Sequence, residues 1–286
     1  MCIRDRASFL GIATAFFREA LDASITNPQD IAHQVSLPIL GTAPGLAKSN
    51  RLLAKLPFIA SSTKSIYPRD VIEWQPFREA LDLIYENFRL AGLNSSLKSL
   101  AITSAIIGEG KSTFILGLAL TMARHQQRVL LIDADLRRPS LHKPFNSSND
   151  SGLADYLAGK TDFPSIKQVS FQEETIDLIT SGVKPIDPAK LLGSKRLEHF
   201  IEREKQNYDV ILVDTPPAIG MVDAIKVASI CDSTVLVLGL DKVKVSELLE
   251  AATLLSKLEV MGIVGNDSKK VSRLYESQPS SLTAQV

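Results

Sequence analysis

Short, continuously apolar runs recur between residues 99 and 264, and helix-length segments lie between most of them. Because each run has the length of a strand and is apolar at consecutive positions, it is expected to be buried on both faces. Strands that alternate with helices form a mostly parallel sheet covered by helices on both sides. The runs lie at 99–103, 129–133, 176–180, 209–214, 234–239 and 260–264, and helices are expected at 79–89, 112–125, 188–203, 222–230 and 244–258.

Composition excludes several classes of protein. The 286 residues are 45% hydrophobic and 22% charged, which is typical of a globular domain. Lys+Arg and Asp+Glu both total 32, so the formal net charge is zero and no nucleic-acid partner is expected. The two cysteines, Cys2 and Cys231, are too few for a metal cluster.

The first apolar run leads into residues 105–112, AIIGEGKS, which fit a phosphate-binding loop with Ala105 at its first position. Gly108 and Gly110, on either side of Glu109, allow the backbone to turn its N–H groups toward phosphate oxygens. The following helix adds partial positive charge at its N-terminus. Lys111 can bridge the β- and γ-phosphates, the Ser112 hydroxyl can ligate Mg²⁺, and Thr113 can donate to the α-phosphate. The prediction is a three-layer, P-loop NTPase-like α/β fold that binds ATP and Mg²⁺.

Carboxylates follow two other strands at the same expected edge of the sheet. In DADLRRP, Asp133 can orient Mg²⁺ or accept a proton from an incoming hydroxyl, and Asp135 can hold a Mg²⁺-bound water. Asp214, at the tip of the run 209–214, is the expected second carboxylate on the metal side. Asn266 follows the last strand; it can contact the edge of an adenine or simply form a turn.

The N-terminal part has two interpretations. Residues 7–17 are apolar and lie between Arg6 and Arg18, but are about half as long as a membrane span. They form either a loosely packed helix or the cytoplasmic end of a transmembrane helix. Residues 21–75 are expected to be a juxtamembrane linker with a short strand at 37–41, either attracted to anionic lipids through its basic residues or simply solvated. The predicted division is 1–20, 21–75, a catalytic domain at 76–267 and a flexible tail at 268–286.

Three motifs, AIIGEGKST, VLLIDADLRRP and DVILVDTPPAIGMVDA, together resemble the bacterial tyrosine kinases of capsule and exopolysaccharide synthesis. The resemblance covers about residues 75–267. It implies a transferase that phosphorylates tyrosines of its own C-terminal tail between subunits of a ring. Lys111, Asp133 and Asp135 take the catalytic roles, and Ser112, Asp133, Asp135 and Asp214 take the metal-binding roles. It also implies a location at the cytoplasmic face of the bacterial inner membrane and, as partners, the polysaccharide polymerisation and export machinery and a tyrosine phosphatase.

The sequence departs from this family at several positions. Ile107 stands where the loop usually has proline. Asp82 and Tyr85 replace the two arginines of a Glu-x-x-Arg-x-x-Arg motif that begins here at Glu79 and forms subunit contacts in the family. Tyr275 is the one tyrosine of the tail and the candidate phosphoacceptor. A catalytically degenerate nucleotide-binding scaffold is therefore one alternative function. A ParA/MinD-like ATPase switch is another, although those proteins carry lysine where Ile106 stands.

Overall fold

The computed structural model describes residues 24–26, 31, 34–45, 74–93 and 97–266. The strands and helices are, in chain order, β1 (Ile39–Thr42), α4 (Gln75–Leu90), β2 (Ser99–Ser104), α5 (Lys111–Arg124), β3 (Val129–Asp133), α6 (Leu153–Leu157), β4 (Ile166–Phe171), β5 (Glu174–Ile179), α7 (Pro188–Leu192), α8 (Lys195–Glu204), β6 (Val210–Asp214), α9 (Val222–Ala228), β7 (Ser233–Gly239), α10 (Val245–Leu255) and β8 (Val260–Asn266).

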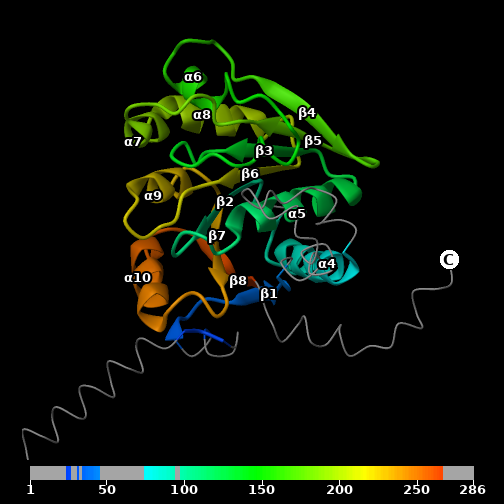
Figure 1. Cartoon of the computed structure of the whole chain (residues 1–286), viewed down its shortest axis with the longest axis vertical. Helices are drawn as coiled ribbons and strands as arrows, with labels where there is room; N and C mark the ends of the chain where they lie inside the picture. The colour runs from blue at the N-terminus through cyan, green and yellow to red at the C-terminus, as the bar shows by residue number, and fades with distance from the viewer. Residues whose placement is uncertain (1–23, 27–30, 32–33, 46–73, 94–96, 267–286) are drawn as a thin grey trace, which may run out of the picture.

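One eight-stranded sheet, in the order β1-β8-β7-β2-β6-β3-β5-β4, runs through the domain (Figure 1). All neighbouring strands are parallel except β4 and β5, which form an antiparallel hairpin. In the register of β6, Asp214 lies beside Ile102 of β2 and beside Asp133 of β3. The carboxyl ends of β2, β6 and β3 are therefore consecutive at one edge of the sheet.

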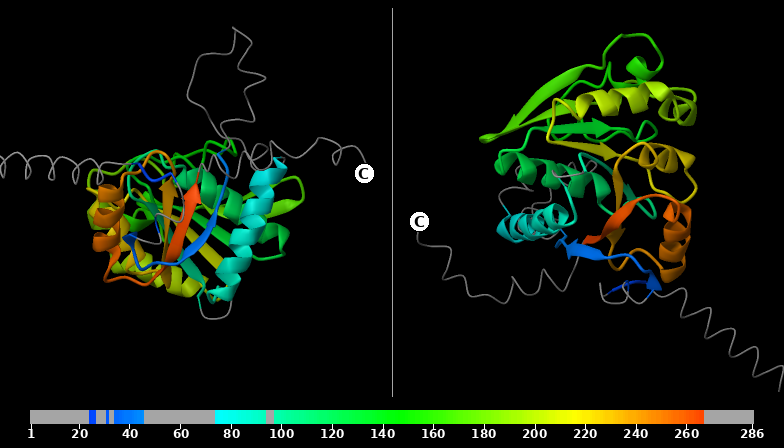
Figure 2. Two further views of the ribbon diagram at one scale, coloured as in Figure 1. Left: turned by 90° about the horizontal axis from the view of Figure 1, so that it is seen from below. Right: turned by 180° about the vertical axis from the view of Figure 1, so that it is seen from behind.

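Helices cover both faces of this sheet, which confirms the predicted three-layer α/β fold. In β2, Leu100 and Ile102 belong to a buried cluster with α4 and α5, whereas Ala101 belongs to a second cluster with α6, α8 and α9. A third cluster joins α10 to β7 and β8. Figures 1 and 2 show α4 and α5 on one side of the sheet and α7 to α10 on the other. Burial on both faces explains why the strands are apolar at consecutive positions.

Part of the expected linker belongs to the sheet. β1 pairs with β8, and Ala43 donates its N–H to the Gly265 carbonyl at 2.8 Å. Ile25 and Ile31 are buried in the cluster beneath α10. The strand expected at 37–41 is present, shifted by one or two residues, and gives this segment a structural role that a solvated linker lacks. The proposed boundary at residue 76 stays a prediction. The predicted segment 1–20 and tail 268–286 lie outside the described residues.

Two further differences concern local structure. The helix expected at 188–203 is two helices, α7 and α8, because the chain breaks at Gly193 and Ser194. A side chain at Gly193 would lie 2.8 Å from the Lys226 ammonium, so α7 approaches α9 closely at that glycine. The edge strand β4 was not predicted, because its alternating exposed and half-buried residues produce no continuous apolar run. Within the described ranges, no helix is both long and apolar enough to cross a bilayer.

Candidate functional site

The loop between β2 and α5 has the backbone geometry of a phosphate cradle. Gly108 and Gly110 adopt φ of 88° and 85°, in the left-handed region that favours glycine. A Cβ at Gly110 would lie 2.1 Å from the Asn266 side-chain nitrogen, so glycine is also required there for space. No side chain caps the N-terminus of α5, which leaves its first N–H groups to a ligand in the loop.

Lys111, Ser112 and Asp214 form one polar cluster at the mouth of this loop. Lys111 makes an ion pair with Asp214, and the Ser112 hydroxyl donates to the other carboxylate oxygen of Asp214 at 2.8 Å. Lys111 and Asp214 are both buried. The β6 strand therefore brings a carboxylate more than 100 residues away in sequence onto the two loop residues predicted to hold phosphate and Mg²⁺.

Asp133 lies beside Asp214 and has one carboxylate oxygen without a hydrogen bond. Its Oδ2 accepts the backbone N–H groups of Ser140 and Leu141 at 3.1 and 3.0 Å. Its Oδ1 is buried and makes no hydrogen bond. Burial, and then the nearby charge of Asp214, raise the pKa of Asp133 to about 7. A buried, unpartnered oxygen beside a second carboxylate and a serine hydroxyl fits the oxygen donors that Mg²⁺ prefers.

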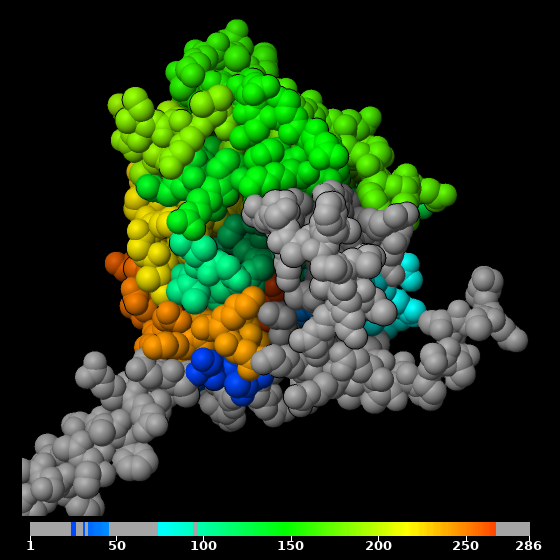
Figure 3. Space-filling model, in the orientation of Figure 1, coloured from blue at the N-terminus to red at the C-terminus, as the bar shows by residue number. Residues whose placement is uncertain are grey.

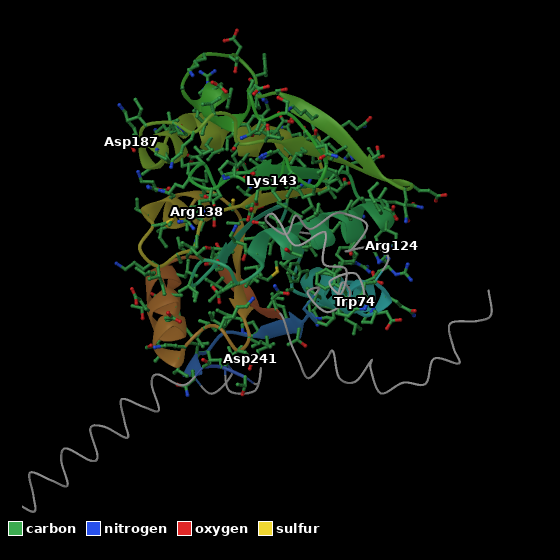
Figure 4. All side chains as sticks on the ribbon, in the orientation of Figure 1. Trp74, Arg124, Arg138, Lys143, Asp187 and Asp241 are labelled. Atoms are coloured by element: carbon green, nitrogen blue, oxygen red, sulfur yellow. The ribbon has the colours of Figure 1, made fainter. Side chains whose placement is uncertain are left out.

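The segment after β3 brings further charged side chains to the site. Asp135 accepts the backbone N–H of Arg138 at 3.0 Å, which holds the turn that carries Arg138. Arg137 donates through two nitrogens to the buried carboxylate of Asp223 at 2.5 and 3.1 Å. Arg138 and Lys143, both labelled in Figure 4, are exposed. Arg137, Arg138 and Lys143 therefore bring three cationic side chains to the cavity that Asp135 also lines.

The loop between β2 and α5 and the turn after β3 line a cavity of about 580 Å³, which is large enough for a nucleotide. In the space-filling view, teal residues of the loop region lie between green residues of the segment after β3 and orange residues of the segment after β7 (Figure 3). The predicted residues Gly108, Glu109, Gly110, Lys111, Ser112, Thr113 and Asp135 line the cavity, together with Ile107, Arg137, Arg138, Lys143 and Met221.

Ala105, Asp133, Asp214 and Asn266 lie behind this lining. Ala105 and Asp133 are fully buried at the ends of β2 and β3. Asn266 donates its side-chain N–H to the Glu109 carbonyl at 2.8 Å. Because that bond uses the amide nitrogen, the predicted adenine contact would have to use the amide oxygen, which can accept from the adenine amino group. The adenine contact stays a prediction.

The sequence places Glu109 among the nucleotide-binding residues of the loop but assigns no role to its side chain. The Glu109 carboxylate accepts the N–H of Ile106 at 2.7 Å and the N–H of Gly239 at 2.9 Å. The glutamate is 1% exposed, which is unusual for an unpaired acid. No pattern in the sequence signals this role, since Gly239 lies 130 residues away.

The departures on α4 are explained by contacts within the chain. Asp82 makes an ion pair with Arg124 at the end of α5. Tyr85 is buried, and its ring lies 4.9 Å from the His125 ring. Glu79 accepts a hydrogen bond from Gln75 at 2.7 Å. At the positions of the two family arginines, this helix therefore carries side chains that bind α5 of the same chain.

Comparison with known proteins shows what this chain is similar to. A family described as "AAA domain" matches residues 97–258. The chain is 36% identical to the tyrosine-protein kinase YwqD of Bacillus subtilis over 195 residues, covering 68% of this chain and 81% of that one. It is 32% identical to the putative tyrosine-protein kinase EpsB of Ralstonia solanacearum, covering 90% of this chain but only 34% of EpsB. The kinase domain of the Escherichia coli tyrosine kinase ETK superposes with a TM-score of 0.72 at 28% identity, covering 84% of this chain and 94% of that domain.

Proposed function

The chain belongs to the bacterial tyrosine-protein kinases, a P-loop family, and we propose that it transfers the γ-phosphoryl group of ATP to tyrosines of other copies of the same chain. The observation that carries the proposal is the meeting of three sheet ends: the loop after β2, Asp214 of β6, and Asp133 of β3. A nucleotide-binding loop beside a buried carboxylate with a free oxygen can both hold the phosphates and receive a proton from an acceptor hydroxyl.

Each residue has a distinct part in the proposed transfer. The N–H groups of the loop and of the first turn of α5 bind the phosphate oxygens. The Lys111 ammonium leaves Asp214 for the β- and γ-phosphates, where it stabilises the charge of the transferring group. Ser112, Asp133 and Asp214 would hold Mg²⁺, with Asp135 binding one of its waters, and the ion would neutralise phosphate charge. Asp133, whose Oδ1 makes no hydrogen bond, accepts the proton of the tyrosine hydroxyl.

Tyr275 is the proposed acceptor. Among the described residues, Tyr85 and Tyr156 are buried. Tyr208 donates its hydroxyl to Asp177 at 2.7 Å, and burial raises its pKa, so it is a poor nucleophile. Tyr275 lies outside the described residues, together with Tyr67. We infer that the tail presents Tyr275 to the site of a second copy.

The cellular role follows from the family in the same way. We infer that the activity regulates polymerisation and export of an exopolysaccharide or capsule at the cytoplasmic face of the inner membrane. The membrane, the export machinery and a tyrosine phosphatase would be its partners. Because the chain spans about a third of EpsB, these roles belong to the longer assembly rather than to the described domain alone.

A nucleotide-binding scaffold is the second candidate function. The observation that favours it is the use of Asp82 and Tyr85 within the chain, at positions where the family carries subunit-contact arginines. A scaffold does not need transfer between subunits. The intact set of Lys111, Asp133 and Asp214 favours the kinase. An ATPase switch is disfavoured by Ile106, where that class has lysine.

The test is incubation with Mg²⁺ and γ-labelled ATP, followed by mass spectrometry for phosphotyrosine and by a free-phosphate assay. We expect phosphotyrosine at Tyr275, lost in Lys111→Met and in Tyr275→Phe. Lys257→Met, which removes an exposed lysine just after α10, is the matched control and should retain labelling. Phosphate release without phosphotyrosine would support the ATPase switch, and nucleotide binding without either product would support the scaffold. Labelling that persists in Lys111→Met would refute the assigned site.

A further inference from the structure

A carboxylate inside the phosphate-binding loop bridges the loop and a neighbouring strand. The Glu109 side chain turns back to accept the N–H of Ile106, three residues earlier in the same loop, at 2.7 Å. Its second oxygen accepts the N–H of Gly239, at the end of β7, at 2.9 Å. One side chain thus closes the turn of the loop and fixes the closed turn to the sheet.

Two other contacts hold the same stretch of backbone. Asn266, at the end of β8, donates to the Glu109 carbonyl at 2.8 Å. Lys242, in the segment after β7, donates to the Gly108 carbonyl at 3.2 Å. A Cβ at Gly239 would lie 3.1 to 3.2 Å from three atoms of Glu109, so β7 packs tightly against this residue. Groups outside the loop therefore determine where residues 108–110 lie.

This arrangement matters for binding because a glycine-rich loop needs contacts that fix its conformation. Glycine has more conformational freedom than any other residue, and two glycines flank Glu109. A phosphate cradle works only if its N–H groups converge on one point, and ordering a loose loop lowers the affinity for the ligand. Hydrogen bonds to a charged acceptor are stronger than those to a neutral one. A buried glutamate carboxylate is therefore an effective group for holding this loop in place.

We propose that Glu109 is a positioning residue for the nucleotide, whose carboxylate binds the phosphate-binding loop to β7 and so keeps the loop's N–H groups in the arrangement that receives phosphate oxygens. The proposal rests on the proposed nucleotide site, but not on the identity of the phosphoacceptor. Glu109 acts through the loop and needs no contact of its carboxylate with the nucleotide.

The charges around Glu109 give the proposal a second readout. Burial, with a smaller contribution from Glu247 of α10, raises the pKa of Glu109 to about 7, against the lowering effect of the N–H groups of Ala105, Ile106 and Gly239. The Lys242 ammonium donates a hydrogen bond to the neighbouring Gly108 carbonyl. Protonation of the Glu109 carboxylate turns one of its accepting oxygens into an O–H group, which no longer accepts the N–H of Ile106 or Gly239. The nucleotide affinity of the wild-type chain should therefore fall as the pH is lowered from 8 to 6.

The experiment measures the dissociation constant of methylanthraniloyl-ADP, and of ATP by competition, with excess Mg²⁺ for the full chain and its variants. In Glu109→Gln, the amide nitrogen faces one of the two N–H groups, so one hydrogen bond is lost and both dissociation constants should rise about 10- to 100-fold at pH 8. Glu204→Gln is the matched control: it neutralises another buried glutamate, on α8, and should bind as the wild type does.

A second variant separates positioning from folding. Gly239→Ala leaves the glutamate charged but pushes it aside, and it should weaken binding in the same direction while thermal unfolding stays cooperative. The ratio of dissociation constants between Glu109→Gln and wild type should shrink from pH 8 to pH 6, because at pH 6 the protonated Glu109 of the wild type also loses a hydrogen bond to the loop. Titration of Asp133 and of the nucleotide affects both proteins equally and does not change this ratio. Wild-type affinity in both folded variants would overturn the proposal. Failure of the wild type to bind nucleotide would instead refute the proposed function.

Discussion

Replacing Asp133 by Asn should make the protein more stable and inactive at the same time. Asp133 is fully buried, and its Oδ1 has no hydrogen-bond partner. Its pKa is raised from 3.8 to about 7, which corresponds to about 4 kcal/mol of destabilisation when the group is ionised. Asparagine keeps an oxygen for the N–H groups of Ser140 and Leu141, and its NH₂ group can donate to Asp214. Local relaxation reduces the gain, so about 1 to 3 kcal/mol is expected.

The sign of the effect depends on pH. Because the folded-state pKa lies above the unfolded value, ionised Asp133 destabilises the fold above pH 7, and this penalty fades as the pH falls toward 4. Thermal unfolding in EDTA should therefore show Tm of Asp133→Asn higher by about 3 to 10 °C at pH 8, and by much less at pH 4.5. Phosphotyrosine labelling should be lost. Asp162→Asn, at an exposed site, is the matched control. A lower Tm at pH 8, or an equal gain at both pH values, would refute the reasoning.

Two further substitutions test the Arg137–Asp223 ion pair and the packing of the phosphate-binding loop. Arg137→Ala leaves the buried Asp223 carboxylate unpaired and should lower the free energy of unfolding by about 2 to 4 kcal/mol. Urea denaturation measures this change, and an unchanged midpoint would show that water replaces the guanidinium. Gly110→Ala places a Cβ against Asn266 in a backbone region that favours glycine, so nucleotide binding measured by calorimetry should fall below detection while the circular dichroism spectrum is kept; normal binding would contradict the tight packing of the loop.

The parts of the fold that were predictable are those with a local signal. Continuous apolar runs gave β3 at its observed bounds and β2, β6 and β7 to within a residue, because strands buried on both faces need apolar side chains at every position. The hairpin strand β4 was missed, because an edge strand is half exposed and its pattern resembles a loop. The break between α7 and α8 depends on a glycine near Lys226, a contact invisible in sequence.

The candidate site divides in the same way. The glycines, Lys111 and Ser112 were predictable because a loop that binds phosphate needs these residue types at fixed spacing. Asp133 and Asp214 were predictable as acids at strand ends that share one edge. The hydrogen bonding and protonation of these acids were not predictable. The free oxygen of Asp133 depends on two backbone N–H groups that bind its other oxygen, and its pKa depends on burial beside Asp214.

The layered α/β fold, the phosphate-binding loop and the acids beside it were therefore predictable from residue type and local spacing. Three other features became visible only in the folded chain: β1 joins the sheet, Asp82 and Tyr85 contact α5, and Glu109 binds the loop to β7. These features depend on which distant groups meet in the interior. The buried Glu109 carboxylate persists there because the N–H groups of Ile106 and of the distant Gly239 compensate its loss of water.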